Sequence, residues 1–203
     1  MNKNNKNEAF ILASGSPRRR ELLRQLGFSF TVVPSSLEET NQRGMEPRRQ
    51  ATYFAKEKAK EVAQRYPQQW VLAADTIVVV DEEILGKPVD FAEATAMLSR
   101  LSERSHHVLT GVSLIHAQYG VEESQLVETK VFMRRLGAAD IEGYIATGEP
   151  MDKAGAYGIQ GIGGCLVQRI EGSYSNVVGL PLCETVELLR RHRVADPFSS
   201  NIS

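Results

Sequence analysis

Apolar and polar positions along the chain alternate in blocks that predict both strands and helices. Apolar runs predict strands at residues 10–13, 28–33, 70–80, 84–85, 108–117, 125–133 and 165–170. Helical periodicity, bounded by capping residues, glycine or proline, predicts helices at residues 17–26, 47–65, 90–101, 140–147 and 181–191. Strands and helices alternate in the first half, and hairpins follow in the middle. This order predicts an α/β fold with a mixed, twisted sheet flanked by helices.

The length of the chain and its composition favour one folded unit. The chain has 203 residues, of which 42% are hydrophobic and 24% charged, as is usual for globular proteins. No internal repeat and no long linker divides it. We therefore expect a single domain over residues 1–203, with an ordered core over about 9–192 and flexible tails.

The charge balance and the lack of long apolar segments argue against several classes of function. Lysine and arginine number 24 and aspartate and glutamate 25, which is not the basic excess of a protein that coats DNA. No window approaches the ~20 apolar residues of a membrane span. The polar start does not resemble a signal peptide. We therefore expect a cytoplasmic protein with neither nucleic-acid nor membrane partners.

The start of the first predicted helix carries an unusual charge. Three arginines, residues 18–20, occupy the end where the helix dipole disfavours cations, by roughly 0.3–1 kcal/mol for each exposed charge. A bound anion would reverse the sign of this effect. The hydroxyls of Ser14 and Ser16 and the guanidinium groups of Arg18 and Arg19 suit a phosphate. The alternative is a solvated basic surface with an ordinary helix cap.

Lys58 lies within the apolar stripe of the second predicted helix. At ~100° per residue it falls on the same side as Ala51, Ala55 and Val62. Its ammonium group must therefore meet an anion there or extend to water. Because the stripe is apolar, we expect methionine at position 58 to maintain or raise stability.

Asp75 is the one charge within the apolar run 70–80. A buried carboxylate must be paired, hydrogen-bonded or bound to a metal, and the alternative role is to cap a neighbouring loop. Glu38 and Glu39, in the loop after the second strand, could join Asp75 as oxygen ligands of Mg²⁺ or Mn²⁺. On their own these two glutamates would be typical of a solvated loop.

Four segments in this order resemble the Maf family of nucleoside triphosphate pyrophosphatases, over about residues 9–192. They are Leu12-Ala-Ser-Gly-Ser-Pro-Arg-Arg19, Ala73-Ala-Asp-Thr76, Gly86-Lys-Pro88 and Asp152-Lys-Ala-Gly-Ala-Tyr-Gly-Ile-Gln160. The resemblance implies an inosine-triphosphatase-like fold with a cleft between two lobes. It also implies metal-dependent hydrolysis of a nucleoside triphosphate to the monophosphate and pyrophosphate.

The resemblance also bears on the substrate. Arg18, Thr76 and Gln160 match the branch that acts on dTTP and UTP, and the branch that acts on 7-methyl-GTP differs at these positions. These three residues would read the base, and Arg18 or Thr76 could hold the amide of Gln160 in one orientation. Where family members often have Asp-x-Asp-Glu, this chain has Ser-Leu-Glu-Glu. That departure leaves open whether Glu38, Glu39 or both touch the metal, and we favour Glu39.

The resemblance assigns further roles to the residues singled out above. Asp75 would be the general base and, with Glu39, a metal ligand. The expected substrate-binding residues are Ser14, Ser16, Arg19, Lys58 and Lys87. We also expect a homodimer. The remaining alternatives are a nucleotide-binding regulatory module without turnover, a pyrophosphatase of the 7-methyl-GTP type, and a metal-dependent nuclease or phosphatase.

Overall fold

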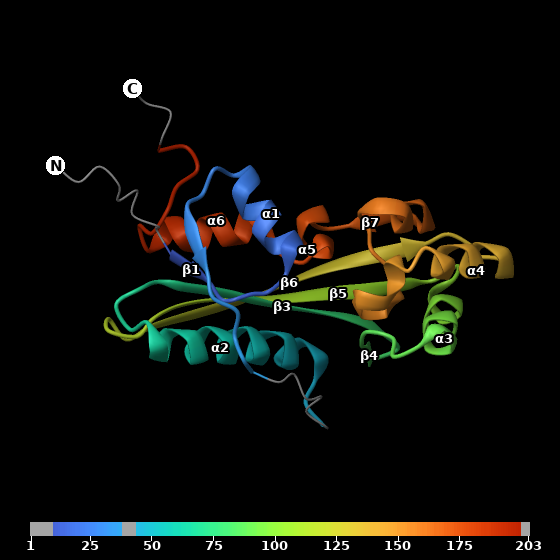
Figure 1. Ribbon diagram of the computed structural model, residues 1–203, viewed down its shortest axis with the longest axis horizontal. Coiled ribbons are helices and arrows are strands. Elements are labelled where there is room, and N and C mark those ends of the chain that lie inside the picture. Colours follow the sequence, from blue (N-terminus) through green and yellow to red (C-terminus); the bar gives the residue numbers. More distant parts are fainter. Residues whose placement is uncertain (1–9, 38–43, 200–203) are drawn as a thin grey trace.

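A mixed sheet forms the centre of the computed structural model, which describes residues 10–37 and 44–199 (Figure 1). Its seven strands in the described residues are β1 (Phe10–Leu12), β2 (Phe30–Val32), β3 (Val71–Val80), β4 (Glu83–Leu85), β5 (Ser105–His116), β6 (Val121–Met133) and β7 (Val167–Glu171). The strand order is β2-β1-β3-β5-β6-β7, and β4 pairs with β3. β1 runs parallel to β2 and β3, and the other pairs are antiparallel.

Helices cover both faces of this sheet, which confirms the predicted α/β class (Figure 1). The α-helices are α1 (Pro17–Gln25), α2 (Pro47–Arg65), α3 (Phe91–Leu101), α4 (Ala138–Ala146), α5 (Tyr174–Val178) and α6 (Leu182–Arg191). α2 lies on one face, and α1, α5 and α6 lie on the other. Within the described ranges, no helix has the length and apolar character needed to cross a membrane.

The predicted elements are all present, with shifted ends, and one further helix is present that the sequence pattern does not predict. β5 and β6 begin three and four residues earlier than expected, because the hairpin between them is longer. The glycine-rich stretch forms short 3₁₀ turns, η1 (Glu149–Asp152), η2 (Ala154–Ala156) and η3 (Gly161–Leu166). The five-residue helix α5 was not predicted, since one turn is too short to show a helical period.

β3 is apolar at both ends and polar in the middle. On one face, Leu72 and Ala74 belong to an apolar cluster beneath α1 and α6, whereas Val78 and Val80 belong to a second cluster beneath α3 and α4. Thr76 lies between these two clusters, because alternate residues of a strand share a face. Asp75 is correspondingly placed on the other face, which α2 covers. The apolar core is therefore divided in the middle of the strand.

The neighbouring strand β5 continues this polar boundary. Thr110 pairs with Thr76, and Gly111 pairs with Asp75. A Cβ atom on Gly111 would lie 2.3 Å from the backbone oxygen of Ala51 in α2, a distance that no side chain tolerates. Glycine at this position therefore lets α2 pack closely over the centre of the sheet, beside Asp75.

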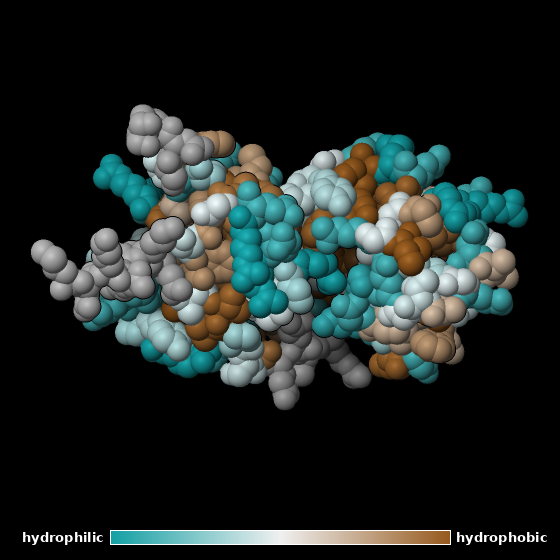
Figure 2. Space-filling view, turned by 45° about the horizontal axis from the view of Figure 1, so that its top comes forward, coloured by the Kyte–Doolittle hydropathy of each residue, from teal (hydrophilic) through white to brown (hydrophobic). Residues whose placement is uncertain are grey.

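An opening at the edge of β3 coincides with the same boundary. β1 pairs with β3 at Val71 and Leu72, and β4 pairs with it at 78–80. Between them, residues 73–77 pair only with β5 in the part of the chain that the structure describes. The space-filling view shows the surface hollowed between two parts of the molecule (Figure 2). This hollow agrees with the predicted cleft between two lobes.

His106 on β5 is buried, and this makes stability depend on pH. Its Nε2 lies 2.7 Å from the hydroxyl of Tyr157. Burial lowers the pKa of His106 to about 4, and the charge of His107 acts in the same direction. In the unfolded chain the pKa returns to about 6.5. As pH falls, the unfolded state therefore binds this proton first, and the fold loses stability.

We expect this one group to lower the free energy of unfolding by about 3 kcal/mol between pH 6.5 and pH 4. Urea unfolding at a series of pH values measures the effect in the wild type and in His106→Gln, whose amide can still bond to Tyr157. The slope of the free energy of unfolding against pH should become flatter in His106→Gln and remain as in the wild type in His107→Gln. Equal slopes for the wild type and His106→Gln would contradict the assignment.

Candidate active site

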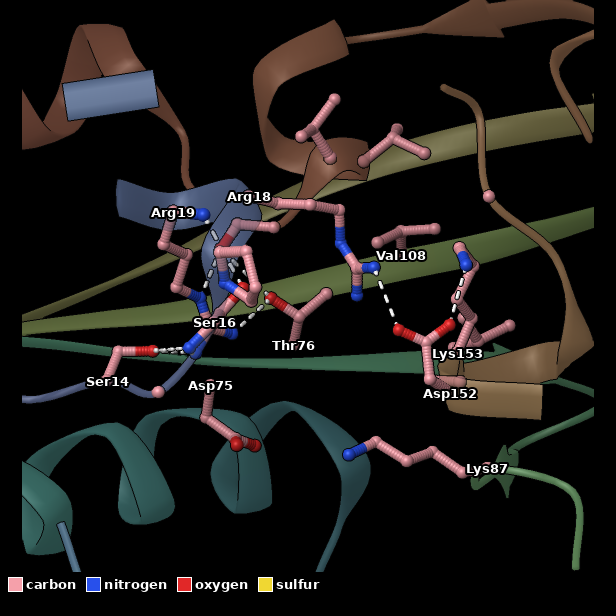
Figure 3. A pocket seen from close by; sticks show the side chains of 18 of the residues that line it. Ser14, Ser16, Arg18, Arg19, Asp75, Thr76, Lys87, Val108, Asp152 and Lys153 are labelled. Carbon is pink, nitrogen blue, oxygen red and sulfur yellow. Dashed lines mark hydrogen bonds and ion pairs between the residues drawn. The ribbon is translucent and has the colours of Figure 1, made fainter. Parts of the chain in front are cut away.

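A cavity of about 410 Å³ opens at the polar boundary of the sheet, and the predicted site residues gather around it (Figure 3). The predicted residues that line it are Ser14, Ser16, Arg18, Arg19, Lys58, Asp75, Thr76, Lys87 and Gln160. They come from the connection between β1 and α1, from α1, α2 and β3, from the connection after β4 and from the glycine-rich stretch. Glu38 and Glu39, proposed above as metal ligands, lie outside the described residues.

Arg19 is held in the cavity by three separate parts of the chain. Its Nε donates to the carbonyl oxygen of Gly179 at 2.8 Å, Nη1 donates to Ser14 Oγ at 3.2 Å, and Nη2 donates to Thr76 Oγ1 at 3.0 Å (Figure 3). Gly179 ends α5, the helix that the sequence pattern does not predict. The signals that could have revealed α5 are Ser173, which caps it, and the glycine itself. The guanidinium group is thus fixed before any ligand binds.

The start of α1 has the predicted form. Ser16 caps the helix by accepting a hydrogen bond from the backbone N–H of Arg19, and Pro17 follows it. No acidic residue lies in the first turn. Arg18 and Arg19 line the cavity, whereas Arg20 does not. Two of the three arginines at this helix end therefore lie in the cavity wall.

Lys58 and Asp75 form a buried ion pair. The ammonium Nζ of Lys58 donates to Asp75 Oδ1 at 2.6 Å, and the two residues are only 7% and 4% exposed. The inward position predicted for Lys58 is confirmed, and its ammonium group meets an anion instead of extending to water. Because one carboxylate oxygen receives the ammonium, the pair also fixes the orientation of Asp75 in the cavity wall.

The hydroxyl of Thr76 is engaged within the protein. It accepts from Arg19 and lies within hydrogen-bond distance of Thr110 Oγ1, at 3.0 Å, and of the carbonyl oxygen of Gly179, at 3.3 Å. Gln160 is exposed and forms no side-chain hydrogen bond within the described residues. Neither Thr76 nor Arg18 therefore holds its amide in the structure, and Thr76 instead orients Arg19.

An ion pair that was not predicted from the sequence joins α1 to η1. Arg18 Nη1 lies 3.5 Å from Asp152 Oδ2, and Lys153 Nζ donates to Asp152 Oδ1 at 2.6 Å. Burial opposes ionisation of Asp152, but the hydrogen bond and charge of Lys153, with the charge of Arg18, keep the pKa of this carboxyl below its usual value. The adjacent Asp and Lys in the glycine-rich motif were the signal available in the sequence.

Over the described ranges of the chain, cations outnumber anions around the cavity. This part of the lining contains five cationic residues and two carboxylates, those of Asp75 and Asp152. Lys87 is exposed, and its side chain extends towards Asp75 from the opposite wall (Figure 3). Among the described residues, no three His, Cys, Asp or Glu side chains gather as a metal site. The cavity therefore suits a highly negative ligand, with Asp75 as a carboxylate directed towards it.

The fold and the cavity define an α/β protein with a cationic cleft across its central sheet. The chain belongs to the Maf family. The sequence pattern of this family, described as Maf-like protein, matches residues 9–192. This confirms the family that the four sequence motifs indicated.

Curated relatives match almost the whole chain. A dTTP/UTP pyrophosphatase of Desulfotalea psychrophila is 50% identical, over 91% of this chain and 94% of that protein. A protein of the same name from Myxococcus xanthus is 51% identical, over 94% of this chain and 96% of that protein. Another from Salmonella typhimurium is 52% identical, over 88% of this chain and 90% of that protein. A solved HAM1 protein from Coxiella burnetii has a TM-score of 0.45 at 21% identity, over 63% of this chain and 73% of that one. That last likeness is too weak to bear on function.

Proposed function

We propose that this protein hydrolyses dTTP and UTP to the nucleoside monophosphate and pyrophosphate. The observation that carries the proposal is the position of Asp75, a buried carboxylate in the wall of a cavity whose described lining includes five cationic residues. The curated relatives at about 50% identity bear the name of this activity. Cationic side chains suit a triphosphate, and a carboxylate beside them suits the activation of water.

The residues of the cavity divide into two groups by chemistry. Arg19 and Lys87 would bind the phosphates, with the hydroxyls of Ser14 and Ser16 as further donors. Asp75 would accept a proton from a water molecule that attacks the α-phosphorus. The bond between this phosphorus and the bridging oxygen then breaks, and pyrophosphate leaves with that oxygen. Lys58 would hold the Asp75 carboxylate towards the water through the 2.6 Å contact.

A divalent cation, Mg²⁺ or Mn²⁺, belongs to this proposal. Mg²⁺ in nucleotide enzymes is commonly held by one or two carboxylates together with substrate phosphates. The carboxylate of Asp75 is an oxygen donor of the right kind, and Glu39 would be the second ligand. When bound, the metal would supply charge neutralisation for the phosphates and a more acidic water.

A panel of nucleoside triphosphates tests the proposal, with the products distinguished by chemistry. The purified protein with Mg²⁺ should release pyrophosphate from dTTP and UTP, and much less from CTP, 7-methyl-GTP and unmodified purine triphosphates. Release of inorganic phosphate, or cleavage of an oligonucleotide, would indicate the phosphatase or nuclease alternative. Binding of dTTP without any product would indicate a regulatory module.

Gln160 should contribute most to the choice of base. Uracil and thymine present a carbonyl at position 4 and an N3 donor, whereas cytosine presents an amino group and an N3 acceptor. An amide that both donates and accepts suits the first pattern, and each buried group left unpaired costs ~1–3 kcal/mol. We therefore expect Gln160→Ala to lower the ratio of kcat/KM for dTTP over CTP roughly tenfold. Equal kcat/KM values of the wild type for dTTP and CTP would contradict the assignment to this branch.

Two expectations about the whole protein complete the proposal. The homodimer is a prediction that analytical ultracentrifugation tests, with a mass of twice 22.5 kDa as the expected result. The single domain over 1–203 is a prediction that limited proteolysis tests. A stable fragment much shorter than 9–192 would contradict it.

A further inference from the structure

Glu149, at the start of η1, receives three hydrogen bonds. Its Oε1 accepts from the hydroxyl of Tyr144 and from the backbone N–H of Gly163, both at 3.0 Å, and its Oε2 accepts from the backbone N–H of Ile162 at 3.0 Å. Burial opposes ionisation, but the two backbone N–H groups and the phenol keep the pKa of this carboxyl below its usual value. Glu149 is therefore a charged acceptor that ties down one end of the segment 158–163.

Tyr144 ties down the other end of the same segment. Its hydroxyl donates to Glu149 and accepts from the backbone N–H of Gly158 at 3.2 Å. The two ends lie against each other, because a Cβ atom on Gly163 would be 2.4 Å from both the Gly158 carbonyl oxygen and the Tyr144 hydroxyl. The segment is thus a closed loop whose ends meet at one phenol and one carboxylate.

Gln160 lies between the two ends of this loop. The residue lines the cavity, and its side chain forms no hydrogen bond of its own within the described residues. The position of its amide therefore depends on the backbone that carries it. That backbone is held at Gly158 by Tyr144 and at Ile162 and Gly163 by Glu149.

We propose that Glu149 and Tyr144 are positioning residues that determine base selectivity by holding the 158–163 loop, and with it Gln160, against the cavity. This inference rests on the proposed function, since it concerns how the same site chooses its base. Neither side chain lines the cavity, so neither touches the substrate. Their effect reaches the nucleotide only through the loop.

Glu149→Gln is the informative change. A glutamine at this position has one acceptor oxygen and an NH₂ group, so at least one of the three donors would face another donor. We expect the ratio of kcat/KM for dTTP over CTP to fall roughly tenfold, as in Gln160→Ala, while kcat for dTTP changes by less than about threefold. Glu142→Gln, the same substitution at an exposed site of α4, is the matched control and should retain the wild-type ratio.

A double-mutant cycle distinguishes an effect of Glu149 that acts through Gln160 from a general loss of order in the 158–163 loop. If Glu149 acts through Gln160, Glu149→Gln adds little to the loss of selectivity already caused by Gln160→Ala. Tyr144→Phe removes only the hydroxyl and should lower the ratio in the same direction, and it carries the test if Glu149→Gln does not fold. An unchanged ratio in the folded variant, or full additivity with Gln160→Ala, would overturn the inference. A wild type that does not cleave dTTP would instead overturn the proposed function.

Discussion

Asp75→Asn is expected to lower the turnover of dTTP by roughly 10²–10⁴-fold, the usual contribution of a general base. The amide is nearly isosteric with the carboxylate but cannot accept the proton of the attacking water. It is also a poorer ligand for a divalent cation. The measurement is the rate of pyrophosphate release at saturating dTTP and Mg²⁺.

Three controls accompany this variant. Far-UV circular dichroism and thermal unfolding establish that it is folded, and binding of dTTP by calorimetry establishes that the cationic lining still holds the nucleotide. Asp152→Asn is the matched substitution at a second carboxylate of the cavity, which is already engaged by Lys153. We expect a much smaller loss of turnover there. If folded Asp75→Asn retained turnover within a few-fold of the wild type, Asp75 would not be the base.

Lys58→Met is expected to destabilise the protein, contrary to what the apolar stripe by itself indicates. Removing Lys58 deprives the buried Asp75 carboxylate of its ammonium partner at 2.6 Å. Breaking a buried ion pair from one side typically costs ~3–5 kcal/mol. Turnover should also fall sharply, because the carboxylate loses the contact that orients it. Urea unfolding at pH 7 and pyrophosphate release measure the two effects.

The double variant Lys58→Met/Asp75→Leu is the control for this interpretation. A buried ion pair replaced on both sides by apolar residues of similar size is often neutral or stabilising. We therefore expect the double variant to recover most of the stability lost in Lys58→Met, and none of the activity. If Lys58→Met were as stable as the wild type, the pair would contribute nothing to the fold.

Much of the fold could be predicted because its elements carry local signals. β3 is a long apolar run, and α2 combines a proline start with an apolar stripe, so each is evident within its own segment. α5 has no such periodic pattern, since its five residues complete little more than one turn, and its only local signals are the capping residues Ser173 and Gly179. The register that pairs Thr76 with Thr110 and Asp75 with Gly111 depends on two strands that are far apart in the sequence.

The candidate site was predictable where a residue conflicts with its local surroundings. Asp75 interrupts an apolar strand, and Lys58 interrupts an apolar stripe. Arg19 is a cation at the start of a helix, where the dipole favours anions. Asp152 and Glu149 show no such conflict, because acidic residues in a turn are ordinary. Their contacts with Arg18 and with the glycine-rich loop depend on the tertiary structure.

The sequence by itself determined the class of fold, the family and which charged side chains need a partner, because periodicity, capping and buried charge are properties of neighbouring residues. Only the tertiary structure decided which partner each one has. Lys58 meets Asp75 from 17 residues away, and Arg19 meets the carbonyl oxygen of Gly179 from 160 residues away. Such contacts follow from strand register and from the close packing that Gly111 allows between α2 and the sheet, which no local pattern encodes.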